Sequence, residues 1–127
     1  MSENKNETFE IILEYIKDLS IETPSASTLL NVRERLGDYH MDIDISTLAL
    51  KNKSLEVTTK LILQDKNDNK EKSFFEIKYA TVISIDSSIN DKKMISKIVL
   101  CDLQNIIYPK IVKIFISLIK DAGYPGV

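Results

Sequence analysis

The chain contains very little glycine, histidine and cysteine, and it contains no tryptophan. Its 127 residues include three glycines, one histidine and one cysteine. Because two of the glycines lie at the end of the sequence, there is no glycine-rich loop to cradle a phosphate group. The single cysteine, Cys101, excludes a disulfide within the chain and is typical of a reducing compartment.

The side-chain groupings of catalytic and metal sites are missing as well. His40 has no cysteine partner at metal-ligand spacing, so a solvated histidine is the simpler interpretation. Asp42 and Asp44 share one predicted strand face, where paired carboxylates usually serve solvation. Cys101 follows an apolar run, which predicts a buried and inert thiol. With no nucleophile beside a base, we expect a protein that is not an enzyme and uses neither a metal nor another cofactor.

Long apolar runs are also lacking. Lys113 interrupts the apolar part of residues 105–120, which is too short for the roughly 20 residues of a membrane span. No basic segment followed by an apolar one opens the sequence, so we expect a cytoplasmic protein without a secretory signal. The length predicts one domain over residues 1–127, in which residues 1–8 form a disordered tail.

Charge of either sign is moderate but unevenly distributed. Residues 1–48 hold four basic and ten acidic side chains, a net charge of −6, whereas residues 49–127 hold thirteen basic and nine acidic ones, a net charge of +4. The acidic first half argues against a nucleic-acid surface there and favours a basic partner, although a merely solvated face explains the same bias.

Four stretches have the period-two alternation of strands with one buried face. In the first stretch the apolar side consists of Phe9, Ile11, Leu13, Tyr15, Leu19 and Ile21, and the polar side of Glu10, Glu14, Asp18, Ser20 and Glu22. In the second, Tyr39, Met41, Ile43 and Ile45 oppose His40, Asp42, Asp44 and Ser46. The third and fourth are Leu55–Leu63 and Phe74–Ile85, and the turn-forming residues 65–70 between them predict a hairpin.

The segment between the first two strands, Ser25–Asp38, does not alternate. Its leucines, with Val32, fit either a helical turn or an apolar crossover, and Gly37 would stop a helix. After the strands, residues 91–100 have helical spacing, and a main helix is predicted from Pro109, because proline suits a first helical turn. Strands followed by helices predict an α+β fold, an antiparallel sheet with two helices packed on one face.

The main helix is more apolar than a surface helix requires. Its polar stripe is narrow and consists of Lys110, Lys113, Ser117 and Lys120. The remaining surface is apolar and includes Ile111, Val112, Ile114, Phe115, Ile116, Leu118 and Ile119. This pattern fits a central helix in a monomer, or a helix that lies between its own sheet and a partner subunit.

Several motifs together resemble SecB, the family of tetrameric export chaperones of bacteria. They occur in family order, with nearly family spacing, from residue 9 to the end of the sequence. The stretches that carry the resemblance are Tyr15–Pro24 (YIKDLSIETP), Met41–Asp44 (MDID), Phe75–Ile77 (FEI) with Ser84–Ile85, Asn105–Pro109 (NIIYP) and Gly123–Pro125 (GYP).

The resemblance implies a four-stranded antiparallel sheet with a crossover between strands one and two, and a homotetramer built as a dimer of dimers. It also implies a holdase that keeps preproteins unfolded and passes them to the SecA motor without using ATP itself. The family's usual glycine pair is replaced by Ala80 and Thr81, and the family's final helix would follow Val127, so the C-terminal helix is absent from this sequence.

The resemblance and the chain's own pattern together predict three sets of site residues. The SecA-docking set, which the resemblance implies, is Asp18, Glu22, Phe74 and Glu76. For the client groove the resemblance implies Tyr39, Met41 and Ile43, for which plain core positions are an equal alternative, and Leu29, Leu30 and Val32 are added because the crossover lies next to these residues in the chain. For the oligomer interface the resemblance implies Phe75, Ile77 and Tyr79, and the apolar excess of the main helix adds Ile111, Ile114, Phe115 and Leu118. Two other functions stay open: a SecB-like chaperone dedicated to one partner, such as an antitoxin, and a small-ligand carrier.

Overall fold

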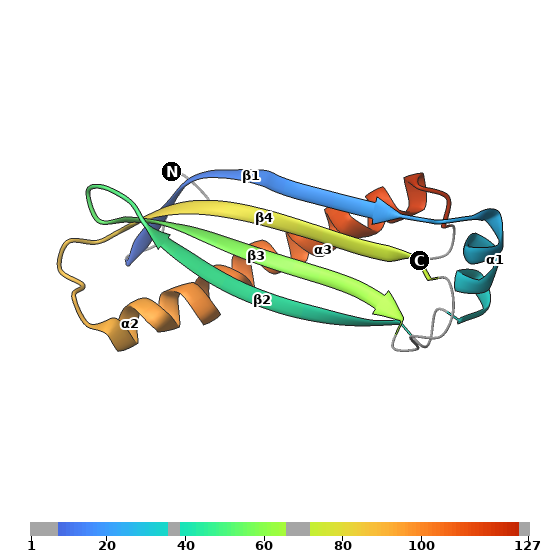
Figure 1. Cartoon of the computed structure of the whole chain (residues 1–127). Helices are drawn as coiled ribbons and strands as arrows, with labels where there is room; N and C mark the ends of the chain where they lie inside the picture. Colours follow the sequence, from blue (N-terminus) through green and yellow to red (C-terminus); the bar gives the residue numbers. More distant parts are fainter. Residues whose placement is uncertain (1–7, 36–38, 66–71, 125–127) are drawn as a thin grey trace.

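The computed structural model describes residues 8–35, 39–65 and 72–124, and for residues 31–35 it describes the backbone alone. Four strands are followed by a nearly continuous helical segment, with one helix inserted after the first strand (Figure 1). In chain order the elements are β1 (Phe9–Glu22), α1 (Ala26–Arg35), β2 (Tyr39–Ala49), β3 (Ser54–Asp65), β4 (Phe74–Ile85), α2 (Lys92–Lys97), η2 (Ile98–Asp102) and α3 (Leu103–Asp121).

The strands form one antiparallel sheet in the order β1-β4-β3-β2. The chain therefore crosses from one edge of the sheet to the other between β1 and β2, and α1 forms this crossover. The non-alternating segment is thus a helix. The pairing of β3 with β4 confirms the predicted hairpin partners, whereas the turn residues between them, and Gly37, lie outside the described part of the chain.

Helices α2, η2 and α3 lie on one face of the sheet, here called the inner face, and the other face is called the outer face (Figure 1). The core lies between α3 and the inner face. In α3 every fourth side chain is buried, at Leu103, Ile107, Ile111, Phe115 and Ile119. These residues pack with the buried side of β4, whose inner residues are those that the alternation predicts. The α+β fold with helices on one face is confirmed.

The main helix begins earlier than the sequence predicts. α3 starts at Leu103, and Pro109 lies inside it rather than in its first turn. The preceding segment, η2, is a π-helical turn that joins α2 to α3 without a break. The prediction from Pro109 was wrong because packing of Leu103 and Ile107 against the sheet stabilises a helix that the proline alone would disfavour.

β1 departs from strict alternation at two bulges. The register shifts between Ile11 and Leu13 and again between Ile16 and Asp18. Each bulge inserts one extra residue and so exchanges the two faces. Between the bulges, Leu13 and Tyr15 lie on the outer face and Glu14 on the inner face. The assignment of Leu13 and Tyr15 to the buried side was therefore wrong, because alternation assumes an unbroken ladder.

Hydrogen bonds between hydroxyl groups connect the residues after α3 to the end of β1 and the start of β4. The Tyr124 hydroxyl hydrogen-bonds with those of Thr23, just after β1, and Ser73, just before β4. Ser73 also donates its backbone N–H to the Tyr39 hydroxyl at 3.1 Å, and Phe75 meets the Tyr124 ring edge-on. Gly123 has a φ of 113°, a left-handed conformation that suits the end of a helix.

Candidate functional site

A groove follows the inner side of β2, where the helices leave this edge strand partly uncovered. α3 buries the inner residues of β3 and β4, but Met41 and Ile43 of β2 remain exposed, Ile43 by 49%. Two hollows lie along this strand, and we call them together the β2 groove. The first is bounded by α3, and the second by α2 and η2.

The first hollow has a volume of about 300 Å³ and is lined by Ile43, Gln104, Asn105, Tyr108 and Pro109. The four helical residues lie beside the buried stripe of α3, on the side that faces β2. Gln104 donates to the Thr59 hydroxyl at 3.1 Å and to the Val99 carbonyl at 3.3 Å, so its amide is held in place. Next to the hollow, the Tyr108 hydroxyl lies 3.9 Å from the Met41 sulfur.

The second hollow has a volume of about 380 Å³ and is lined by uncharged side chains. These are Ile45, Ser46, Thr47, Leu55, Ile95, Ser96, Val99 and Leu100. The η2 turn contributes Val99 and Leu100. Both hollows therefore have the same two walls: β2 forms one wall, and the helical segment from α2 to α3 forms the other.

The structure brings only part of the predicted client-groove set to these hollows. Ile43 lines the first hollow, Met41 lies beside it, and Tyr39 is half-buried at the start of β2. Leu29 packs near Gly123 and Leu30 is 60% exposed, but neither lines a described hollow. The side chain of Val32 lies outside the described residues. α1 lies at the end of the sheet, away from these hollows (Figure 1), so a part of Leu29, Leu30 and Val32 in client binding stays a prediction.

The helical wall of the groove is not among the predicted site residues. Gln104, Asn105 and Tyr108 occur within or beside the motif NIIYP, but their spacing alone does not say which side of the helix faces β2. The one signal in the sequence that could have identified these residues as part of the groove is their position next to the apolar stripe of the helix. Cys101 lies nearby on η2 and is exposed, so the prediction of a buried thiol was wrong. The wider π-helical turn changes which residues face the sheet.

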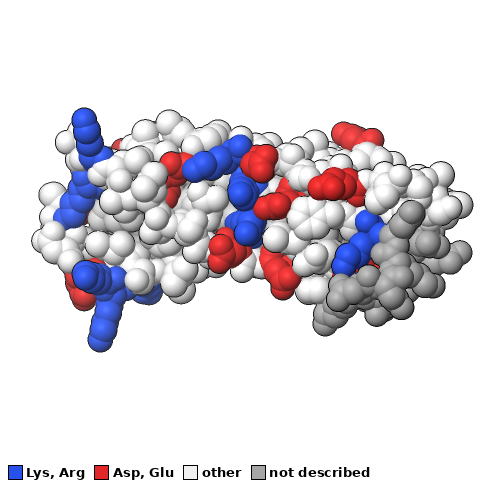
Figure 2. Space-filling model, in the orientation of Figure 1, with Lys and Arg blue, Asp and Glu red and all other residues white. Residues whose placement is uncertain are grey.

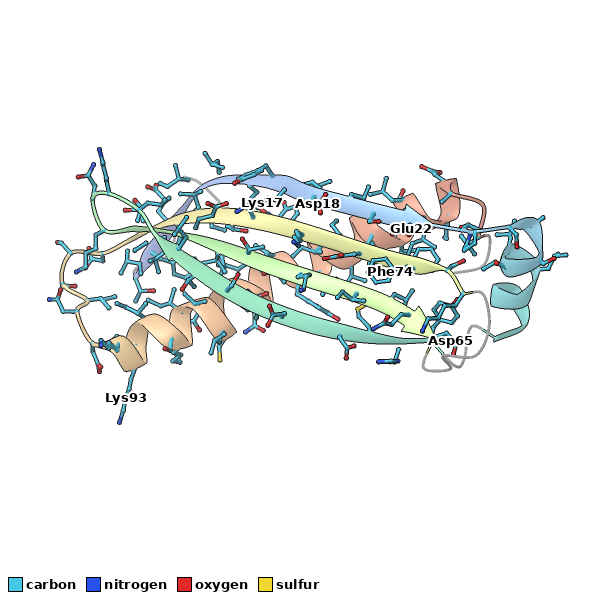
Figure 3. All side chains as sticks on the ribbon, in the orientation of Figure 1. Lys17, Asp18, Glu22, Asp65, Phe74 and Lys93 are labelled. Atoms are coloured by element: carbon cyan, nitrogen blue, oxygen red, sulfur yellow. The ribbon has the colours of Figure 1, made fainter. Side chains whose placement is uncertain are left out.

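The four residues predicted for SecA docking lie close together on the outer face. Glu22 pairs with Phe74 across β1 and β4, and the next two pairs on the same face are Ser20 with Glu76 and Asp18 with Lys78. Figure 3 shows Asp18, Glu22 and Phe74 on these neighbouring strands. Asp18 and Glu22 are exposed, and Phe74 and Glu76 are half-buried. The sequence therefore predicts their common surface correctly, although no contact with a partner follows from it.

Lysines interrupt this acidic surface. Across the four strands, Asp18 is opposite Lys78, Lys78 is opposite Lys60, and Lys60 is opposite Asp44. Figure 2 shows the resulting band of basic and acidic side chains across the middle of the sheet. The outer face is consequently a mixed-charge surface, with its acidic excess at the end that carries Glu22 and Glu76.

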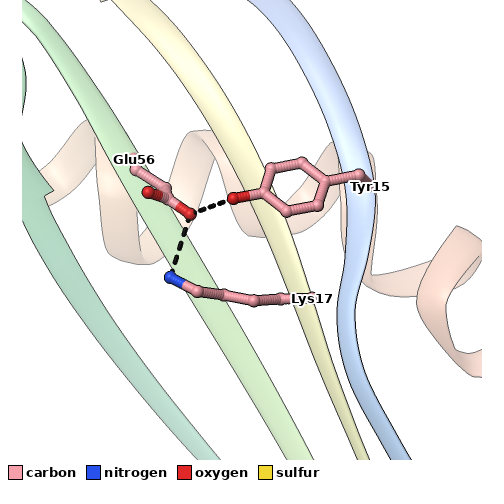
Figure 4. A network of polar contacts seen from close by, with 3 residues as sticks. All are labelled: Tyr15, Lys17 and Glu56. Atoms are coloured by element: carbon pink, nitrogen blue, oxygen red, sulfur yellow. Dashed lines mark hydrogen bonds and ion pairs between the residues drawn. The ribbon is translucent and has the colours of Figure 1, made fainter.

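A second polar cluster on the outer face is centred on Glu56 of β3 (Figure 4). This carboxylate accepts hydrogen bonds from the Tyr15 hydroxyl and, at 3.1 Å, from the Lys17 ammonium. The hydrogen bond from Tyr15, followed by that from Lys17, lowers the pKa of Glu56. The same contact with Glu56 raises the pKa of Lys17 and of Tyr15. Tyr15 lies on the outer face between the two bulges of β1, and Lys17 lies in the second bulge, between Ile16 and Asp18.

On the inner face, Glu14 joins β1 to β4 and α3. It accepts a hydrogen bond from the Tyr79 hydroxyl at 2.9 Å and forms an ion pair with Lys110 at 3.3 Å. Burial, with the hydrogen bond to Glu14, raises the pKa of Tyr79 to about 12. The first bulge thus converts Glu14 from a predicted solvated residue into an anchor for α3.

The predicted oligomer-interface set divides into core and flank. Phe75, Ile77, Ile111 and Phe115 are at most 1% exposed in the single chain, and Tyr79 is also buried. In the single chain α3 and the sheet cover the four core side chains, and their part in an oligomer interface stays a prediction. Ile114 and Leu118 are half-buried on the flank of α3. Ile16 and Leu19 of β1 are exposed on the inner face of the sheet.

The fold and these surfaces can be compared with known proteins. The family described as preprotein translocase subunit SecB matches residues 2–127. The chain belongs to the SecB family. A SecB relative from Pelagibacter ubique, named putative protein-export protein SecB, is 42% identical over 121 residues, which cover 95% of this chain and 86% of the relative. The protein-export protein SecB of Rickettsia felis is 33% identical over 113 residues, which cover 87% of this chain and 72% of that relative.

A solved structure confirms that this is a SecB-like fold. The SecB-like chaperone of Mycobacterium tuberculosis, in complex with a peptide from the HigA1 antitoxin, aligns with a TM-score of 0.69. The alignment covers 94% of this chain and 88% of that chain at 12% identity. In the described part of this SecB-family chain, no helix is long and apolar enough to cross a membrane, and no three metal-ligating side chains gather.

Proposed function

We propose that this SecB-family chain is a cytoplasmic holdase chaperone. In this proposal it binds unfolded preproteins in the β2 groove and passes them to a SecA-like motor for export. The observation that carries the proposal is the pair of hollows along β2, both lined by uncharged side chains, with an isoleucine of β2 in each. Such a surface suits extended apolar segments of many sequences, because apolar contacts are not directional.

The holding activity is tested by suppression of aggregation of an unfolded preprotein and by its binding to the chain. The Ile43→Ala/Tyr108→Ala variant should bind less tightly, because both side chains contact the first hollow and neither belongs to the fully buried core. Leu13→Ala is the matched control, since Leu13 is exposed on the outer face of β1, away from the described hollows. A folded groove variant with unchanged preprotein affinity would place the client site elsewhere.

Transfer to SecA would use the acidic end of the outer face. We expect Asp18, Glu22 and Glu76 to attract a basic segment of the motor, with Phe74 as an apolar anchor. Each exposed ion pair contributes only about 0.2–1 kcal/mol. SecA affinity of Asp18→Asn/Glu22→Gln/Glu76→Gln, measured across a salt series, should be lower and less salt-dependent, with preprotein binding unchanged. Equal affinity at low salt would contradict this docking surface.

A role dedicated to one partner is the second candidate. It is favoured by the antitoxin peptide bound to the SecB-like structural neighbour. Binding assays separate the two roles, because a dedicated chaperone would hold one cognate segment tightly and would fail to bind several unrelated unfolded preproteins. A small-ligand carrier is less well supported, since the groove lies at the free edge of the sheet, along β2.

A further inference from the structure

We propose that α2 is a movable wall of the β2 groove. It unwinds and refolds as a unit while the sheet and α3 stay folded, and Lys53, in the turn between β2 and β3, holds its closed form. Because Ile95 and Ser96 of α2 line the second hollow, unwinding of α2 removes one side of that hollow. The consequence for binding rests on the proposed holding function, whereas the movement itself does not.

α2 has little packing of its own. Five of its six residues are exposed, and the remaining one, Ile95, is half-buried. An isolated helix shorter than about 12 residues is marginal in water, so a helix of this length depends on its neighbours. The positions on either side of α2 are well packed, because Ile89 before it and Ile98 after it are both buried. The weakly held part of the chain is therefore confined to residues 90–97.

The π-helical turn η2 separates α2 from α3. The backbone N–H of Leu103 donates to the carbonyl of Ile98, five residues earlier, instead of four as in an α-helix. Turns of this kind are frequent at functional sites. The regular hydrogen bonds of α3 therefore do not continue into α2, and α2 can unwind while α3 keeps its own.

Lys53 connects the β2–β3 turn to the segment that leads into α2, at the same end of the molecule (Figure 1). Its ammonium donates at 2.9 Å to the Ser87 carbonyl and at 2.9 Å to the Asn90 side-chain oxygen. Its own carbonyl accepts the backbone N–H of Ile85 at 3.1 Å. Asn90 is followed directly by Asp91, whose carboxylate caps the first turn of α2. The contact therefore fixes the residue that precedes the helix cap.

The backbone of Lys53 is strained, which points to a role for its side chain. Its φ is 59°, in the left-handed region that glycine and asparagine adopt more readily than lysine. Asn52, with a φ of 60°, is by contrast a usual residue for such a turn. Glycine at position 53 would remove the strain together with the ammonium. What lysine adds here is the pair of hydrogen bonds to the segment before α2.

Amide hydrogen exchange of the full chain, followed residue by residue by NMR, tests the movement. The probes are the amides of the last three residues of α2, beginning with Ile95, whose N–H donates to the Asp91 carbonyl at 3.1 Å. They should exchange about a hundredfold faster than the core amides of β3 and β4, because α2 opens locally. Low concentrations of urea should leave this local exchange nearly unchanged, since little surface is exposed by it.

Lys53→Met should speed the exchange of the three α2 amides by about two- to tenfold, because the closed form loses two exposed hydrogen bonds. Lys53→Gly should have the same effect on α2, although it relieves the strained φ and should unfold at no lower urea concentration than Lys53→Met. Lys51→Met is the matched control, since Lys51 is an exposed lysine of the same turn that forms no hydrogen bond within the described residues. Unchanged exchange in β3 and β4 establishes that each variant keeps the fold.

A bound segment should hold the wall closed. The probe is a labelled peptide with an apolar core of about ten residues, long enough to follow β2 in extended form, with glutamines at both ends. Fluorescence anisotropy gives its dissociation constant. Because closed α2 supplies one side of the second hollow, peptide at about ten times this constant should slow the exchange of the α2 amides about tenfold.

Three results overturn the inference. The first is α2 amides that exchange only with global unfolding, and the second is α2 exchange that Lys53→Met leaves unchanged. The third is α2 exchange that a bound peptide leaves unchanged or accelerates. If the chain binds neither the peptide nor an unfolded preprotein, the proposed holding function fails, whereas the first two measurements still decide whether α2 is a movable wall.

Discussion

Single residues set the electrostatics of the outer face, and Glu56 is the clearest case. Glu56 is 9% exposed, and its carboxylate accepts hydrogen bonds from two donors, Tyr15 and Lys17. Because the folded-state pKa of Glu56 is lowered, the charged carboxylate stabilises the fold above its unfolded pKa of about 4.3. This contribution is lost as the pH falls through the lower folded-state pKa.

We expect Glu56→Gln to lower the free energy of unfolding at neutral pH and to flatten its decrease as the pH falls below the unfolded pKa of about 4.3. The amide is uncharged and cannot form the ion pair with Lys17, although it can still accept a hydrogen bond. Urea unfolding at several pH values measures both effects. Glu10→Gln is the control, since Glu10 is exposed on β1 and should change neither quantity much. Parallel pH curves for parent and Glu56→Gln would contradict this assignment.

At the scale of elements, the most informative feature is the proline inside α3. Pro109 has no backbone N–H, so the carbonyl of Asn105 loses its usual partner four residues later. Asn105 and Pro109 both line the first hollow. We infer that the helix presents a backbone acceptor there, which a main-chain N–H of a client segment can satisfy.

Pro109→Ala should therefore change stability and binding in opposite directions. Alanine restores the helical hydrogen bond and should raise the free energy of unfolding by about 1–3 kcal/mol. The same bond occupies the Asn105 carbonyl, so affinity for an unfolded segment should fall. Thermal or urea unfolding and peptide anisotropy measure the two quantities. A gain in stability with unchanged affinity would show that this carbonyl takes no part in binding.

At the scale of the whole molecule, we expect the uncovered apolar flank of α3 to form an interface with a second copy of the chain. Leu118 and Ile114 are half-buried on the side of α3 that carries Lys110, and Ile16 and Leu19 are exposed on the inner face of β1, the strand that Lys110 contacts through Glu14. Scattered apolar residues are normal on a surface, but a contiguous patch of this kind is typical of an interface. A second copy of the chain would cover this flank and make α3 a helix between two sheets.

We expect Leu118→Asp to reduce the assembled mass while the separate chain stays folded, because the charge would be buried in the interface without a partner. Phe115→Asp should instead unfold the chain, at a cost of more than about 3 kcal/mol, because Phe115 lies in the core. Sedimentation and circular dichroism distinguish these outcomes, with Ser117→Asp on the exposed stripe as control. A parent chain that is monomeric at micromolar concentration would contradict the interface.

Much of the sheet follows from the sequence because alternation is a local property. In β4, the buried and open sides match the period of two from Phe75 to Ile85 except at Ala80, which is buried on the open side, and the pairing of β3 with β4 follows from the turn residues between them. The sequence alone also contains the family motifs, and it alone shows that glycine-rich and nucleophile motifs are absent. These features need no knowledge of which elements meet in space.

The β2 groove, by contrast, is decided by the tertiary structure. Whether Ile43 is core or binding surface depends on where α3 crosses the sheet, and the side of α3 that faces β2 depends on the π-helical turn before it. The faces of Glu14 and Tyr15 depend on two bulges that become visible only when β1 pairs with β4. Periodicity shows which side chains are apolar, because it is a local property of the sequence. Whether those side chains are buried depends on long-range packing, because the element that covers them belongs to a distant part of the chain.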